Sequence, residues 1–186
     1  AILFSVADEK KQEKILKNVL ENDEIPAITT PYFNFFELDV LCRMGKLTEV
    51  LDKIRSYWGG MLDLGAVTFW EEYDPSVPKE EQYDMYGDHF GKSLCHAWAA
   101  SPIYFLAKYF AGLDLVNKDG VTYILKPQMQ YFTELDCTLP VGSNGVMRLV
   151  WDGEILEITP NADGGILELG EQKLSLVRGE TRRVKI

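Results

Sequence analysis

Two stretches near the start of the chain arrange apolar and polar positions as helices do. In residues 8–22, apolar side chains recur at the helical interval among charges, which predicts a surface helix with one buried face. The next stretch begins with Thr30 as an N-cap and Pro31 at the first helical position, and it ends at Gly45. Because apolar side chains cover most of its circumference, we expect this second helix to be buried between neighbours.

The same periodicity predicts two more helices. Residues 46–57 form the third, which we expect the glycine pair 59–60 to end. Residues 92–111 form the fourth, in which Pro102 implies a kink or a break and Gly112 marks the end.

After Val116 the pattern changes to short runs rich in β-branched and aliphatic residues. The predicted strands are 122–125, 134–139, 145–151, 154–159, 166–169, 174–177 and 182–186. Asn-Gly or Asp-Gly pairs, which favour hairpin turns, occur at 119–120, 144–145, 152–153 and 163–164. Such spacing is typical of a small antiparallel β-sandwich. The predicted fold class is therefore multidomain α and β, with a helical domain at 1–113 followed by a β-sandwich domain at 114–186.

The connection between the third and fourth predicted helices has a distinct composition. Residues 60–91 mix aromatic side chains with seven carboxylates between Asp63 and Asp84, and Pro75 and Pro78 interrupt the segment. Long aromatic and acidic loops in a compact domain usually carry function. We therefore look for chemistry in this segment.

The charge distribution narrows the class of partner. The net charge is −10, with 11 Lys and Arg against 19 Asp and Glu up to Asp114, and 8 against 10 after it. Without a run of basic residues, neither a nucleic acid nor an anionic membrane surface is an expected partner. No apolar stretch approaches the roughly 20 residues of a membrane helix. The abrupt apolar start, which lacks the basic region of a signal peptide, leads us to expect that further sequence precedes it.

Metal and disulfide chemistry is not predicted. Cys42, Cys95 and Cys137 lie far apart without a C-x-x-C pair, so we expect small buried side chains rather than a disulfide framework or a zinc site. Asp84 and Asp88 lack the spacing of a calcium loop, so a solvated acidic face is the expectation there. The sequence therefore predicts no metal and no other cofactor.

The strongest candidate for chemistry is the sequence GAVTFWEEYDP at 65–75, in which aromatic rings flank Glu71 and Glu72. Aromatic faces suit sugar rings, and a carboxylate beside Trp70 could activate a water as the general base of glycoside hydrolysis. Adjacent residues of an extended segment point to opposite sides, so we expect at most one of the two to be catalytic. The residues alone also fit a solvated acidic loop without a catalytic role.

Two further stretches flank this one, YWGGM at 57–61 and SLCHAW at 93–98. In order and spacing the three stretches resemble motifs of the inverting α-L-rhamnosidases of glycoside hydrolase family 78. In that family, the stretch that matches 57–61 is a turn before the base, and the stretch that matches 65–75 is Gly-Ala-Thr-Thr-x-Trp-Glu. The stretch that matches 93–98 holds a histidine that contacts rhamnose. Val67 stands where threonine is usual and Tyr73 where tryptophan is common, and neither change touches the carboxylate.

The resemblance covers the chain from Ile28 onward and implies roles for two residues. Glu71 matches the family's general base, and His96 matches the histidine that binds a sugar hydroxyl. Trp70 is the third candidate site residue, because its aromatic face suits a sugar ring. Taken by itself, His96 on an apolar helix would be interpreted as a core histidine. The implied partner is a rhamnose-containing carbohydrate, and the family suggests a periplasmic or secreted location, although the sequence does not determine the compartment.

The resemblance also implies that part of the enzyme is missing. An inverting glycosidase needs a carboxylic acid opposite the base to protonate the leaving oxygen. In the family this general acid lies upstream, in an (α/α)6 toroid for which this chain has only some of the helices. We therefore expect a partial toroid that contributes the base but not the acid and is inactive alone. The faces that missing helices would cover predict an apolar patch and homo-oligomers.

Two other functions stay open. The chain could be a non-catalytic carbohydrate-binding or structural unit whose aromatic loop serves as a sugar platform. It could also belong to another glycosidase on the same toroid, because a fold does not determine its substrate.

Overall fold

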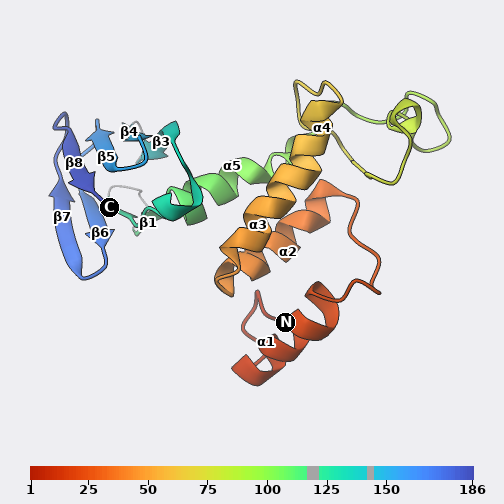
Figure 1. The fold of residues 1–186 in the computed structure, drawn as a ribbon, viewed down its shortest axis with the longest axis horizontal. Coiled ribbons are helices and arrows are strands. Elements are labelled where there is room, and N and C mark those ends of the chain that lie inside the picture. The colour runs from red at the N-terminus through yellow and green to blue at the C-terminus, as the bar shows by residue number, and fades with distance from the viewer. Residues whose placement is uncertain (117–121, 142–144) are drawn as a thin grey trace. The chain divides into compact units, whose positions relative to one another are not determined.

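The structure is a computed structural model that describes residues 1–116, 122–141 and 145–186. The chain divides into two compact units, Ala1–Pro102 and Ile103–Ile186. Unit 1 combines helices with a long irregular connection, whereas unit 2 is mainly β-sheet (Figure 1).

The division between the units falls inside a helix. This helix is α5 (Ser101–Phe105), which continues as the π-helical turn η5 (Leu106–Phe110). Within unit 2, η5 packs against β1 (Leu113–Leu115), and the ring of Phe110 makes edge-on contacts with Tyr131 and Phe132. Through these aromatic contacts, the end of the helix packs against residues 131 and 132 of unit 2. The domain limits predicted at 113 and 114 stay a prediction.

The first two predicted helices are present. The first is α1 (Glu9–Ile15) with the π-helical turn η1 (Leu16–Leu20), and the carboxylate of Asp8 caps it by accepting the Lys11 N–H at 2.9 Å. The second is α2 (Pro31–Arg43), which begins at the expected proline.

The predicted burial of α2 is wrong on one side. Tyr32, Phe33 and Phe36 are exposed on the part of the molecule that the structure describes, whereas Leu38 and Leu41 on the same helix are buried. Gly45, at φ +75°, ends the helix region as expected, in a conformation that favours glycine. The exposed rings leave an aromatic face on α2.

The third predicted helix is longer than expected. Figure 1 shows α3 (Leu47–Lys53) running through the π-helical turn η2 (Ile54–Trp58) directly into α4 (Gly59–Asp63). The prediction that the glycine pair ends the helix is therefore wrong. A Cβ added at Gly60 would overlap the ring of Tyr73. Glycine at position 60 therefore allows close packing instead of ending the helix.

The fourth predicted helix is present only in its second half. Helical structure starts with the 3-10 turn η4 (Ala97–Ala99) and continues in α5. The segment 93–96 is not helical, because its backbone bonds to residues 69–71: the Glu71 N–H donates to the Ser93 carbonyl at 2.9 Å and the His96 N–H to the Phe69 carbonyl at 2.8 Å.

The cysteines only partly follow the prediction of burial. Cys42 is buried and Cys137 is half-buried, but Cys95 is exposed. Cys95 lies in the segment 93–96, where a non-helical backbone replaces the predicted helix.

The described residues of unit 2 form two four-stranded sheets. One has the order β1, β2 (Tyr123–Leu125), β6 (Gly165–Leu169) and β7 (Gln172–Leu176). The other has the order β3 (Leu135–Val141), β4 (Gly145–Trp151), β5 (Ile155–Pro160) and β8 (Arg182–Lys185). All seven predicted strands are confirmed, and β1 was not predicted.

One pairing departs from the predicted antiparallel arrangement. β2 and β6 pair in parallel, which is possible because the three strands β3, β4 and β5 lie between them in the chain and form the long connection that parallel pairing needs. Residues of both sheets share one hydrophobic core. Gly153 and Gly164 have positive φ angles, as Asp-Gly turns require. The turns predicted at 119–120 and 144–145 fall wholly or partly outside the described residues.

Candidate functional site

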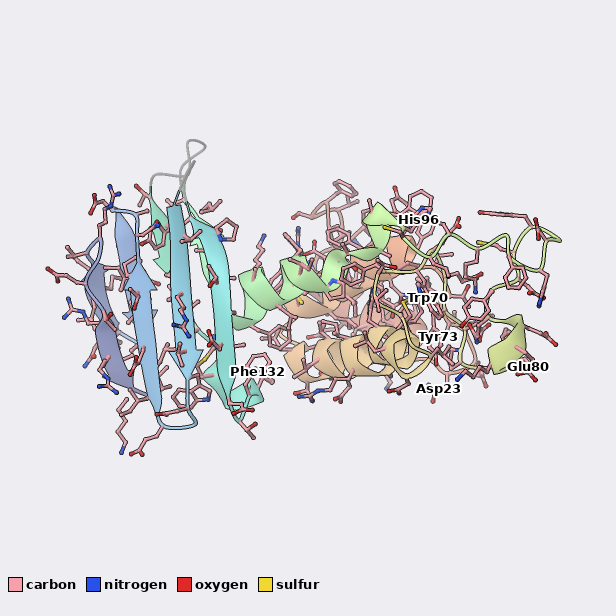
Figure 2. The ribbon with its side chains drawn as sticks, turned by 90° about the horizontal axis from the view of Figure 1, so that it is seen from above. Asp23, Trp70, Tyr73, Glu80, His96 and Phe132 are labelled. Carbon is pink, nitrogen blue, oxygen red and sulfur yellow. The ribbon has the colours of Figure 1, made fainter. Side chains whose placement is uncertain are left out.

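The candidate site lies in the connection between α4 and α5, where Figure 2 labels Trp70, Tyr73 and His96. The backbone bonds between 69–71 and 93–96 place two of the three sequence motifs side by side. The indole N–H of Trp58, in the remaining motif at 57–61, donates to the Ala99 carbonyl at 2.8 Å. Three stretches that are separate in the sequence therefore converge in unit 1.

Glu71 is the central carboxylate of the site, with 7% of its surface exposed. The Tyr86 hydroxyl donates to its Oε1 at 2.9 Å, and the Ser93 N–H donates to its Oε2 at 3.1 Å. His96 Nδ1 lies 3.8 Å from Oε2, which is too far for a hydrogen bond but close enough for an electrostatic interaction. The carboxylate is thus held from two sides, each oxygen by a donor from a different segment.

The surroundings keep Glu71 ionised. Burial acts to raise the pKa of Glu71, but the hydrogen bonds from Ser93 and Tyr86 and the electrostatic interactions with His96 and Lys92 outweigh it, so the pKa lies below its ordinary value. Lys92 is itself buried, and burial lowers the pKa of its ammonium group while neighbouring carboxylates oppose this shift. At neutral pH Glu71 is therefore a carboxylate that can accept a proton.

Glu72 has different partners. Its Oε1 accepts a hydrogen bond from the Thr29 hydroxyl at 2.8 Å. Beside it, the Tyr57 hydroxyl donates to the Thr29 carbonyl and accepts the Tyr73 N–H at 3.0 Å, and burial raises the pKa of Tyr57 well above its usual range. The hydrogen-bond partner of Glu72 thus comes from the segment that precedes α2, whereas both donors to Glu71 come from the 86–96 region.

His96 is not on a helix. Its backbone is extended, with φ −119° and ψ 111°, and its half-buried ring lies 4.1 Å from the ring of Trp98, between centroids. Within the described residues, its buried Nδ1 has no hydrogen-bond partner. The helix predicted around His96 is therefore wrong, and the unpartnered nitrogen of the ring is buried on the side of Glu71.

Trp98 was not predicted as a site residue. Its indole is 51% exposed and lies 5.5 Å from the ring of Tyr32, so the rings beside His96 form an open aromatic face. The sequence signal was available in the His-x-Trp spacing at 96–98, but the sequence predicted a continuous helix there. Trp98 lies instead in the 3-10 turn η4, with its ring exposed.

Trp70 has the opposite environment. Only 3% of its surface is exposed, and its ring packs 5.6 Å from that of Tyr83. The indole consequently has almost no face left for a ligand in this structure.

A separate pocket of about 540 Å³ occurs elsewhere in unit 1. Tyr57, Tyr73, Asp74 and Lys53 are among the residues that line it, whereas Glu71 and His96 are not. Within the described ranges, no three His, Cys, Asp or Glu residues are grouped closely enough to hold a metal, and no helix is long and apolar enough to cross a membrane.

No family model and no curated protein matches this chain. Among solved structures, the chain is similar to the family 78 rhamnosidase of Bacillus sp. GL1, with a TM-score of 0.69 and 24% sequence identity. The match covers 92% of this chain and 18% of the rhamnosidase chain. The resemblance that the three motifs indicated is thereby confirmed at the level of the fold.

Proposed function

We propose that this chain is the C-terminal portion of an inverting glycoside hydrolase that releases terminal α-L-rhamnose from glycans or glycosides, with Glu71 as its general base. The observation that carries the proposal is a largely buried, ionised carboxylate beside the open aromatic face of His96 and Trp98. The fold likeness to a family 78 rhamnosidase supports a glycosidase parent.

The geometry suits the task of a base. Each carboxylate oxygen has two lone pairs, and the donors from Tyr86 and Ser93 occupy one on each oxygen. Capacity for a water therefore remains on Glu71. In inverting hydrolysis this water attacks the anomeric carbon, and its proton moves to the carboxylate while an acid on the other face protonates the leaving oxygen.

Two rings are assigned to the sugar. His96 would exchange a hydrogen bond with a rhamnose hydroxyl through the exposed part of its half-buried ring, as the family resemblance implies. Trp98 would stack on the apolar face of the sugar with its exposed indole. Because Trp70 is buried, we assign it the support of the segment that carries Glu71 and not direct sugar binding.

The general acid is assigned to sequence beyond this chain. The chain spans 18% of the length of the rhamnosidase that it resembles. We also propose that unit 1 is part of an (α/α)6 toroid and that unit 2 is a β-sandwich. We expect the isolated chain to show no turnover of an aryl α-L-rhamnoside.

The test compares Glu71→Gln with Glu72→Gln in the enzyme that contains this chain. Glu71→Gln should lower kcat by about 10²- to 10⁴-fold, as the loss of a general base does, with sugar binding retained. Glu72→Gln is the matched control, because it removes the neighbouring charge and leaves both hydrogen bonds to Glu71 in place, and it should have a much smaller effect. An unchanged rate in Glu71→Gln would reject the base and favour a non-catalytic carbohydrate-binding unit.

A second measurement tests the inverting mechanism. Proton NMR of the first product should show β-L-rhamnose, because inversion changes the anomeric configuration before mutarotation mixes the two forms. An α-configured first product would contradict the proposal.

A further inference from the structure

Tyr86 has a backbone conformation that its residue type rarely adopts. Its φ angle is +55°, in the left-handed region, and Gly87 follows at φ +80°. The two residues form the centre of a tight turn, in which the Met85 N–H donates to the Asp88 carbonyl at 3.0 Å and the Asp88 N–H to the Met85 carbonyl at 2.9 Å. Positive φ angles at both central positions define a type I′ turn, which prefers asparagine or glycine where Tyr86 stands.

The side chain of Tyr86 shows what the unusual backbone achieves. The residue is 81% exposed, yet its hydroxyl reaches the largely buried Glu71 Oε1 at 2.9 Å. The hydrogen bond to Glu71 also raises the pKa of the Tyr86 phenol, so the phenol keeps the proton that it donates. Residues in sparsely populated backbone conformations persist where the surroundings hold them, often at functional sites.

We propose that Tyr86 is a positioning residue for Glu71, held by the turn at 85–88 so that its phenol orients the carboxylate toward the reacting water. The inference rests on the proposed role of Glu71 as the base. A single donor would leave the carboxylate free to rotate, whereas the Ser93 amide on Oε2 and the Tyr86 phenol on Oε1 together define its plane. The remaining lone pairs then have a defined direction.

The charges around Glu71 stay the same when the Tyr86 hydroxyl is removed. His96 and Lys92 favour the ionised form of Glu71, and the charges of Glu71 and Glu72 both raise the pKa of the Tyr86 phenol. Tyr86→Phe leaves these charges in place and removes one donor from the carboxylate. The pKa of Glu71 should therefore rise, because the ionised form loses a hydrogen bond that the protonated form needs less.

The first measurement needs no activity. Carbon-13 NMR of the labelled chain follows the titration of the Glu71 carboxyl in the wild type, in Tyr86→Phe and in Tyr83→Phe. Tyr83→Phe is the matched control, because it deletes the same atom from the same loop, and no hydrogen bond of that hydroxyl occurs among the described contacts. We expect an upward shift of the Glu71 midpoint in Tyr86→Phe alone. The same shift in both variants, or in neither, overturns the proposal.

A second variant tests the turn. Gly87→Ala keeps the phenol but strains a position at positive φ, so it should also raise the pKa of Glu71. An unchanged Glu71 midpoint in Gly87→Ala would show that the turn does not hold the phenol, and it would overturn that part of the proposal.

Kinetics of the enzyme that contains this chain complete the test. Tyr86→Phe should lower kcat by about tenfold with KM little changed, and it should move the acidic limb of the pH profile upward. If Glu71→Gln is inactive but Tyr86→Phe keeps the wild-type profile, only the positioning role fails. If Glu71→Gln retains its rate, the proposed base fails, and the positioning role fails with it even where the NMR shift is present.

Discussion

Unit 2 and the connection between α4 and α5 bury different kinds of side chain. The core of unit 2 consists of hydrophobic residues such as Leu149 and Ile158, which alternate along strands with exposed positions. The connection buries the carboxylate of Glu71 and the ammonium group of Lys92. Buried charges cost free energy unless hydrogen bonds and opposite charges compensate, so the connection depends on its polar contacts around Glu71, whereas the core of the sheets gains stability from the burial of apolar surface.

The largest expected effect is on the stability of the sheets. Leu149→Ala removes a fully buried side chain from β4 and should lower the free energy of unfolding of unit 2 by about 2 to 5 kcal/mol. Hydrogen exchange of the β3, β4 and β5 amides measures this loss. The Glu71 titration should be unchanged in the same variant, and a shifted titration would contradict the separation of stability and chemistry between the two regions.

The next effect is the reverse case, in which binding changes and stability does not. Trp98→Ala removes a half-exposed ring and should weaken sugar binding in the enzyme that contains this chain by about tenfold, seen as a higher KM. Thermal unfolding should move little, because few contacts are lost. Leu94→Ala, at an exposed residue of the same connection, is the control. Equal KM values in the two variants would remove Trp98 from the sugar site.

Acid should affect the connection before the sheets. The pKa of Glu71 is lower in the folded chain than the value of about 4.3 of an unfolded glutamate. Glu71 thus contributes stability above the unfolded pKa, and this stability is lost as the pH falls through the folded pKa. Hydrogen exchange at Ser93 should rise in that window, and Glu71→Gln should abolish the pH dependence there. If exchange in β4 rose at a higher pH than exchange at Ser93, acid would affect the sheets first, contrary to this expectation.

The smallest effect is expected at an exposed ion pair on the sheets. Arg148 donates to both carboxylate oxygens of Asp136, at 3.1 and 2.8 Å, between β3 and β4. Because both side chains are exposed, water and salt screen the pair, and Asp136→Asn should leave the unfolding of unit 2 unchanged within error. A clear loss of stability would show that the surface of the sheets, and not only their core, holds unit 2 together.

The sequence predicted the regular parts of the molecule better than the site. All seven predicted strands are present, because alternation and Asp-Gly turns are local signals that burial on one face reinforces. The predicted helix at 92–111 was wrong in its first half, since the backbone of 93–96 bonds to residues that lie more than twenty positions earlier. Local periodicity contains no information about such a partner.

At the candidate site, the sequence by itself determined which residue types are available: a carboxylate after Trp70, a histidine in the 93–98 motif, and a resemblance that selected Glu71 over Glu72. Only the tertiary structure brought Tyr86 and Ser93 to Glu71, buried Trp70 and exposed Trp98. The physical reason is the distance along the chain over which each kind of interaction acts. Hydrophobic period and turn chemistry act over a few neighbouring residues, whereas the pKa and orientation of a carboxylate depend on donors and charges that the fold delivers from distant parts of the chain.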